Sequence, residues 1–266
     1  MPDSAPGPEV SALADQLGLR HLENLPFGKF LYADESRALI AKVSASPTGL
    51  AMIRNEALGL ERIAPLLGPG IKPPKLHRFI DEDGTAALVM EQLEGSPATK
   101  WQSQGFSLTP ALMKAPSQML LSELLDHHRT DEKLRAGLLD RFGDTTVTVT
   151  PSHGDLVYWN VLRMTSGVGL IDFEYFDEAR VAGFDDLHYL LAPQLFRLSR
   201  WRLPDSVILA AGHIACRRCM AKQRLELDRS LMLAMFFVQW ASIRRRFGLT
   251  GRNELTAQVE RLALKC

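Results

Sequence analysis

The chain has 266 residues, of which 46% are hydrophobic, 23% charged and 8% aromatic. This composition excludes an intrinsically disordered or low-complexity chain, because such chains are poor in apolar residues. The length accommodates one large domain or two intimate ones, each able to bury a core without disulfides. The 31 basic and 31 acidic residues balance, which argues against a dedicated nucleic-acid-binding protein.

The first 93 residues predict a mixed α+β unit, because short β-like runs alternate with segments of helical periodicity. Gly68-Pro69-Gly70 is expected to end the longer of two helices. In chain order we expect a helix over 10–17, strands over 30–32 and 39–43, a helix over 49–67, and strands over 75–80 and 86–93.

The remaining residues, 94–266, are expected to be mainly helical, with Pro116 suited to the first position of a helix. The predicted helices cover 116–128, 132–142, 185–197, 205–223, 227–247 and 253–264, and short strands are predicted over 146–150, 160–164 and 169–173. A small sheet-rich lobe (1–93) followed by a larger helical lobe (94–266) makes a bilobal α+β protein. Ligands commonly bind between such lobes.

The cysteines and the absence of an export signal favour a reduced, cytoplasmic location. Cys216 and Cys219 have redox-motif spacing, but they lie in a helical apolar pattern, which favours a structural role. The N-terminus shows no basic region followed by an apolar one. The most apolar stretch, 231–243, contains Gln239 and is too short to span a bilayer.

Basic residues concentrate near the C-terminus. Residues 197–266 carry 14 Lys and Arg against 5 Asp and Glu. Two interpretations stay open: a solvated basic face on the late helices, or a docking surface for a partner, an anionic substrate or a membrane surface.

The segment 152–162 carries the chemistry. His153, Asp155 and Asn160 have the spacing of a kinase catalytic loop, and Asp172 follows twelve residues after Asn160. Asp155 is predicted to accept the proton of a hydroxyl group and to orient its oxygen, while His153 is expected to orient the loop. Asn160 and Asp172 offer the oxygen ligands that Mg²⁺ prefers.

Two residues upstream fit the same chemistry. Lys42 lies near the end of an apolar strand, where a phosphate-binding lysine is expected, and Glu56 lies in the next helix, where it can pair with Lys42. Neither residue is strong evidence alone. Their order along the chain, together with the catalytic loop, predicts a nucleotide site.

Three segments resemble the aminoglycoside phosphotransferase and choline kinase superfamily: His153-Gly154-Asp155 with Asn160, Ile171 to Tyr175, and Phe184 to Leu187. The resemblance covers about residues 20–190 and is strongest over 152–187. It implies a protein-kinase-like bilobal fold and the use of ATP with Mg²⁺.

The resemblance also assigns roles to single residues. It implies that Asp155 is the catalytic base and that Asn160 and Asp172 are the metal ligands. Lys42 would contact the ATP phosphates, with Glu56 as its partner. The backbone of Glu91-Gln92-Leu93 would form the hinge that binds adenine. The nucleotide loop, 24–32, departs from a glycine-rich pattern, since Gly28 is its only glycine.

The sequence therefore predicts an ATP- and Mg²⁺-dependent phosphotransferase acting on a hydroxyl group of a small molecule, such as an amino sugar or an amino alcohol. Gly154 replaces the arginine that precedes the catalytic Asp in protein kinases, and no Ala-Pro-Glu follows Asp172, so a protein substrate is disfavoured. Acidic residues such as Glu174 favour a cationic acceptor, and late arginines such as Arg197 an acidic one. The alternatives are a sugar or glycolipid kinase of envelope biosynthesis and a nucleotide-binding pseudokinase.

Overall fold

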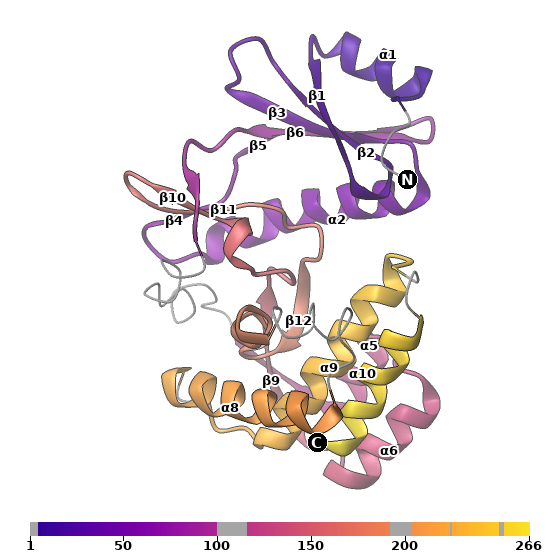
Figure 1. The fold of residues 1–266 in the computed structure, drawn as a ribbon, viewed down its shortest axis with the longest axis vertical. Coiled ribbons are helices and arrows are strands. Elements are labelled where there is room, and N and C mark those ends of the chain that lie inside the picture. Colours follow the sequence, from indigo (N-terminus) through magenta and orange to yellow (C-terminus); the bar gives the residue numbers. More distant parts are fainter. Residues whose placement is uncertain (1–4, 100–115, 192–203, 224, 250–252) are drawn as a thin grey trace. The chain divides into compact units, whose positions relative to one another are not determined.

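The computed structural model describes residues 5–99, 116–191, 204–223, 225–249 and 253–266. The chain divides into two compact units, drawn in Figure 1. Unit 1 comprises Met1–Thr99 and Trp159–Phe176, and unit 2 comprises Lys100–Tyr158 and Asp177–Cys266. Each unit is thus assembled from two separate stretches of sequence. The assignment of nucleotide binding to 1–93 and of catalysis to 94–266 stays a prediction.

Unit 1 contains a five-stranded antiparallel sheet with the strand order β1-β2-β3-β6-β5. Two helices lie on its two sides, α1 on one and α2 on the other (Figure 1). The elements are α1 (Pro8–Gln16), β1 (Arg20–Leu25), β2 (Lys29–Ala33), β3 (Leu39–Ser44), α2 (Pro47–Ile63), β5 (Leu76–Glu82) and β6 (Thr85–Glu91).

Strand β3 shows why the two faces of this sheet differ. Ala41 and Val43 point to the α1 side and join a buried apolar cluster with Val10 and Ala14 of that helix. Side chains alternate along a strand, so Lys42 points to the opposite face, where α2 packs. Helix α2 begins where Ser46 accepts a hydrogen bond from the amide of Gly49 (3.1 Å), a regular N-cap.

A second, four-stranded sheet joins the later stretch of unit 1 to the earlier one. Its order is β4-β11-β10-β7, with β10 and β11 forming a hairpin and β11 running parallel to β4. The strands are β4 (Ile71–Lys72), β7 (Ser96–Pro97), β10 (Val161–Met164) and β11 (Gly167–Leu170).

Unit 2 contains a three-stranded antiparallel sheet, β12-β9-β8, and several helices. Helix α9 is its centre: eleven of its residues are buried, and it packs against α8 and α10. The elements are β8 (Ser117–Leu120), α5 (Leu121–His127), α6 (Glu132–Phe142), β9 (Thr146–Ser152), β12 (Asp177–Val181), a helical segment over 184–191, α8 (Asp205–Gln223), α9 (Arg229–Arg246) and α10 (Asn253–Lys265).

The predicted α+β class is confirmed, and most predicted elements are found within a few residues of their expected ends. Two predictions are wrong: 116–128 is a strand followed by a short helix, and the strand expected over 169–173 ends at Leu170. The predicted helix over 185–197 is observed over 184–191, and the rest of it lies outside the described residues. No helix among the described residues has the length and apolarity needed to cross a membrane.

Candidate active site

Lys42 and Glu56 form a buried ion pair in unit 1. Lys42 lies in the middle of the sheet, opposite Leu31 on β2 and Leu88 on β6. Its Nζ donates to both carboxylate oxygens of Glu56, at 2.8 and 2.7 Å. Only 9% of the Lys42 side chain and 1% of the Glu56 side chain are exposed. The structure thus brings together the two residues that the sequence proposed as partners.

Asp172 is a second carboxylate that binds Lys42. Its Oδ1 lies 2.6 Å from Lys42 Nζ, and the Asp172 side chain is 31% exposed. Its φ angle is +72°, in the left-handed region, which costs a non-glycine residue of the order of 1–3 kcal/mol. This backbone turn ends β11 and directs the carboxylate to Lys42. Burial opposes the charge of Lys42, but Asp172 and Glu56 outweigh it and raise the pKa of Lys42 above its usual value.

Asn160 and Asp172 lie at the open end of the β10–β11 hairpin. Val161 pairs with Leu170, and the amide of Ile171 donates to the carbonyl of Asn160 at 3.1 Å. The hairpin therefore places the two predicted metal ligands just beyond the ends of neighbouring strands. Asn160 is buried and Asp172 is partly exposed. An amide oxygen and a carboxylate in this arrangement fit a hard cation such as Mg²⁺.

A second buried ion pair, absent from the sequence prediction, lies in the same unit. Lys29, the first residue of β2, donates to Glu174, and both side chains are less than a tenth exposed. Asn55 of α2 fixes the same segment, because its Nδ2 donates to the backbone carbonyls of Glu174 (3.0 Å) and Phe176 (2.9 Å). Carboxylate oxygens of Glu56, Asp172 and Glu174 lie within 4.8 Å of one another. Two lysines thus compensate three clustered carboxylates.

The predicted nucleotide loop, 24–32, contains a single glycine, Gly28. Phe27 and Gly28 both have φ near +65° to +68°, so the chain turns sharply between β1 and β2. Ser46 donates to the carbonyl of Phe27 (2.6 Å), and Ser44 donates to that of Gly28 (2.7 Å). A Cβ atom at Gly28 would lie 2.8 Å from the hydroxyl oxygen of Ser46, so the loop needs glycine there. Serine side chains hold the loop.

The predicted hinge continues from the end of β6. Glu91 pairs with Leu39 of β3, and its amide donates to the carbonyl of Lys75 at 2.9 Å. Its carboxylate lies 2.5 Å from Lys72 Nζ, which lowers the pKa of Glu91. Leu93 is buried. The predicted hinge therefore begins at the end of β6, the strand next to the one that carries Lys42.

In unit 2, Asp185 holds the start of the predicted catalytic loop. Its Oδ2 accepts from the amide of His153 (2.8 Å), and its Oδ1 accepts from the amide of Gly154 (3.0 Å) and the hydroxyl of Ser152 (2.9 Å). Gly154 has φ +84°, which turns the chain just before Asp155. The ring Nδ1 of His153 accepts from the amide of Asp155 at 3.2 Å. The orienting role expected of His153 stays a prediction.

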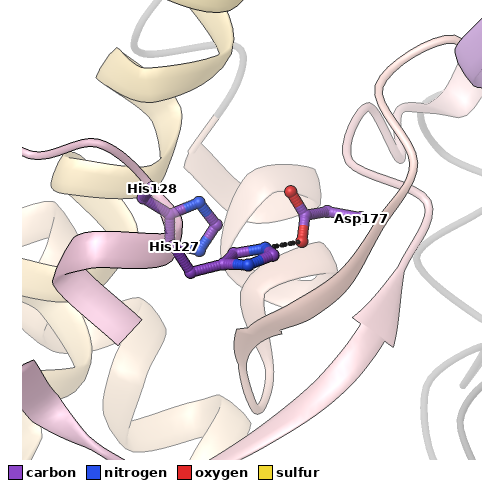
Figure 2. A group of neighbouring side chains, drawn as sticks. All are labelled: His127, His128 and Asp177. Carbon is purple, nitrogen blue, oxygen red and sulfur yellow. Dashed lines mark hydrogen bonds and ion pairs between the residues drawn. The ribbon is translucent and has the colours of Figure 1, made fainter. Parts of the chain in front are cut away.

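Another group of histidines and an aspartate lies at the junction of α5 and β12 (Figure 2). His127 Nε2 lies 2.8 Å from Asp177 Oδ1, and His128 is buried beside it. Arg180 and Arg246 also lie within 3.9 Å and 3.7 Å of Asp177. Although burial opposes it, the hydrogen bond from His127 contributes to a lowered pKa of Asp177. With two arginines this close, the group is an ion-pair network rather than a site for a cation.

The basic triplet at the end of α9 makes contacts within unit 2. Arg244 donates to the hydroxyl of Thr256 (3.2 Å) and to the carbonyl of Leu249 (2.8 Å), and Arg245 pairs with Glu260. These arginines connect α9 to α10 and the turn before it. Their contacts favour a structural role for this part of the basic region. Arg197, Arg200 and Arg202, which also belong to this basic part of the sequence, lie outside the described residues.

No protein-family model and no curated protein matches the sequence. Solved structures do match. Aminoglycoside phosphotransferase APH(3'')-Id from Streptomyces rimosus is 16% identical, with a TM-score of 0.50 over 88% of this chain and 97% of that chain. A thermostable mutant of aminoglycoside phosphotransferase APH(4)-Ia, in a ternary complex with ADP and hygromycin B, is 11% identical, with a TM-score of 0.53 over 96% of each chain.

Amicoumacin kinase hAmiN, in complex with AMP-PNP, Ca²⁺ and Ami, is 11% identical, with a TM-score of 0.50 over 97% of this chain and 92% of that chain. The likeness to these proteins extends over nearly the whole chain and both units. The chain therefore has the kinase-like fold of the aminoglycoside phosphotransferases, which confirms the fold that the sequence resemblance implied.

Proposed function

We propose that this protein transfers the γ-phosphoryl group of ATP, bound with Mg²⁺, to a hydroxyl group of a small molecule. One observation carries the proposal: the Lys42 ammonium is buried between Glu56 and Asp172, at the open end of the hairpin that also holds Asn160. A buried lysine fixed by two carboxylates beside an amide ligand suits a metal-bound phosphate chain. The ADP and AMP-PNP bound to the similar proteins support a nucleotide ligand.

In this proposal the residues of unit 1 bind and orient the nucleotide. Glu56 keeps Lys42 extended, so that its ammonium can move from Asp172 to the phosphate oxygens. Asn160 and Asp172 would hold Mg²⁺, which when bound neutralises charge on the β- and γ-phosphates. The carbonyl of Glu91 and the amide of Leu93 would bind adenine.

The acceptor chemistry belongs to the catalytic loop. Asp155 accepts the proton of the acceptor hydroxyl and orients its oxygen toward the γ-phosphorus. Asp185 assists by fixing the two amides that precede Asp155. In sequence, Asp155 precedes the metal ligand Asn160 by five residues, as the catalytic-loop pattern requires.

The acceptor class is proposed to be an amino sugar or amino alcohol, in keeping with the hygromycin B and amicoumacin named for the similar proteins. The charged residues do not favour one charge of acceptor over another. Glu174 and Asp177 are held in buried ion pairs, and Arg244 and Arg245 make contacts to α10. An acceptor panel should therefore contain cationic, neutral and anionic compounds.

A two-stage experiment tests the proposal. Titration calorimetry first measures Mg–ATP binding, and γ-³²P transfer is then measured across aminoglycosides, amino alcohols, sugars and glycolipid head groups. Asp155→Ala should retain the affinity for Mg–ATP and lower turnover about 10²–10⁴-fold, the usual contribution of a positioned base. Asp140→Ala, on the exposed face of α6, is the matched control.

The outcomes separate the alternatives. Transfer to an amino sugar or amino alcohol that depends on Asp155 supports the proposal, and transfer only to a neutral sugar or a glycolipid head group supports the envelope kinase. Nucleotide binding without turnover on any acceptor supports the pseudokinase. Equal turnover of wild type and Asp155→Ala, with both folded, overturns the assignment of the base.

A further inference from the structure

His188 lies one helical turn after Asp185 on the segment 184–191. Residues three apart share a helix face, so both side chains point to the catalytic loop. Asp185 binds the amides that precede Asp155. His188 binds the carbonyl of Leu156, at 3.3 Å from its Nδ1, and its Nε2 lies 3.6 Å from Asp155 Oδ1. One helix face therefore holds the loop on both sides of the proposed base.

The contacts of His188 define which ring nitrogen carries the proton. A carbonyl oxygen only accepts hydrogen bonds, so Nδ1 must donate to Leu156. The side chain is 6% exposed, and burial lowers the pKa of His188 to about 4, so the ring is neutral at physiological pH. Nε2 is then unprotonated and presents its lone pair to the carboxylate of Asp155.

The ring is also fixed in orientation. It stacks on Phe184, with ring centroids 6.1 Å apart and planes inclined by 12°, and Phe184 is held in turn by the guanidinium of Arg180 (4.5 Å from its centroid) and by Phe236 (5.2 Å between centroids). The stacking fixes the plane of the His188 ring, and a flip within that plane would give up the Leu156 hydrogen bond.

Charged groups on three elements act on His188. Asp185, on its own helix, favours the protonated ring, while Arg180 of β12 and His153 of the catalytic loop oppose it. Two acceptors, the carboxylate of Asp155 and the lone pair of Nε2, thus face each other. A proton that arrives at either one turns this unfavourable contact into a hydrogen bond.

We propose that His188 is a positioning residue that shares the proton which Asp155 removes from the acceptor hydroxyl; the inference rests on the proposed function. The O–H bond of the acceptor breaks and its oxygen bonds to the γ-phosphorus. The bond from that phosphorus to the β,γ-bridging oxygen breaks, and its electron pair leaves with ADP. The proton goes to Asp155 Oδ1, where the carboxyl group donates a hydrogen bond to Nε2 of His188.

The first test needs no turnover. ¹⁵N NMR of the full chain, labelled at histidine, reports the protonation of each ring nitrogen, and His188→Asn assigns the signal. We expect Nδ1 of His188 protonated and Nε2 unprotonated at pH 7. In Asp155→Asn the protonation midpoint of His188 should fall by about 0.5–1 pH unit, because the carboxylate that favours imidazolium is gone. An Nε2–H tautomer, or an unchanged midpoint in Asp155→Asn, overturns the inference.

The second test separates proton sharing from mere packing. In His188→Asn the amide nitrogen can replace Nδ1 at Leu156 while Nε2 is lost. Hydrolysis of Mg–ATP, with water as the acceptor, should show a kcat about 10-fold lower, an unchanged KM for ATP, and an acidic limb of the pH profile at lower pH, because Asp155 becomes less basic. His188→Gln places an amide donor near Asp155 and should lower kcat further.

His213→Asn, on α8, is the matched control and should leave the kinetics and the His188 signal unchanged. A His188→Asn variant with wild-type kcat and pH profile overturns the inference while leaving the proposed function intact. Absence of turnover in the wild type counts against the proposed function instead, and the NMR result then decides alone on the Asp155–His188 contact.

Discussion

The ion pair between Lys42 and Glu56 is expected to contribute measurably to the free energy of unfolding. We consider Lys42→Met, which keeps a side chain of similar length and removes the charge, and Glu56→Gln, which keeps the shape and removes the negative charge. The double variant closes a thermodynamic cycle. The cycle isolates the interaction of the two side chains from their other contacts.

The geometry sets the magnitude. Lys42 Nζ contacts both Glu56 oxygens and one oxygen of Asp172 at 2.6–2.8 Å, in surroundings where Glu56 is 1% exposed. Removing one partner of a buried ion pair costs about 3–5 kcal/mol, so Lys42→Met should lower the free energy of unfolding by that amount. Glu56→Gln should cost about 1–3 kcal/mol, because Asp172 still pairs with Lys42. The double variant should be more stable than the sum predicts by about 2 kcal/mol.

Urea denaturation of the four proteins measures the coupling. A matched control lies on the same helix: Arg54 forms a bidentate pair with Asp81 of β5, at 2.7 and 2.8 Å, but half of the Arg54 side chain is exposed. The Arg54→Gln and Asp81→Asn cycle should give a coupling of at most about 1 kcal/mol. Titration calorimetry on the Lys42 and Glu56 variants measures their affinity for Mg–ATP. Adding Glu56→Gln to Lys42→Met should lower this affinity little further.

The prediction is contradicted if the coupling between Lys42 and Glu56 is no larger than the coupling between Arg54 and Asp81. Glu56 would then not be fixed by the ammonium, and its proposed role in orienting Lys42 toward phosphate would fail. Strong coupling in stability with none in nucleotide affinity would confine the pair to a structural role.

Three further predictions follow from other contacts. Asp172→Asn removes a carboxylate from a hard-cation site and should abolish the Mg²⁺ dependence of ATP binding in calorimetry; wild-type affinity and metal dependence would contradict this. Gly59→Ala would bring a Cβ atom to 2.8 Å from Phe176 Cβ, so urea denaturation should show a loss of about 1–3 kcal/mol, despite the better helix propensity of alanine; a gain in stability would contradict it. Burial lowers the pKa of His128 to about 3 and that of His188 to about 4, from 6.5. Below pH 6.5 the unfolded chain takes up protons that the folded chain does not, so stability should fall with pH by up to about 1.4 kcal/mol per unit for each histidine, and a flat profile from pH 6.5 to 5 would refute this.

Local patterns were sufficient to find part of the candidate site. Lys42 lies in an apolar run and Glu56 in the periodic segment that follows, and fourteen residues separate them. Lys29 and Glu174 were missed because 145 residues separate them, and nothing near either one marks it as half of a buried pair. A contact between elements so distant in the chain depends on the tertiary fold, which periodicity does not encode.

The errors in the predicted elements have a similar cause. Strand β1 was missed because nearly all its side chains are exposed at the edge of the sheet, so it lacks an apolar alternation. Pro116 suits a helix start and so predicts a helix over 117–120, yet these residues form β8 and pair with β9. The strand expected over 169–173 ends early because Asp172 adopts a positive φ, which no sequence pattern predicts.

The interleaving of the two units has a consequence for synthesis on the ribosome. Strands β4 and β7 of the earlier stretch find their sheet partners only in β11 and β10. A nascent chain that has been translated as far as residue 99 can therefore form the five-stranded sheet but lacks the second sheet, together with Asn160 and Asp172. Translation proceeds at about 5–20 residues per second, so residues 159–176 of unit 1 are synthesised several seconds after residue 99. A fragment ending near residue 99 should consequently leave Lys42 without Asp172 and should not form unit 1 in full.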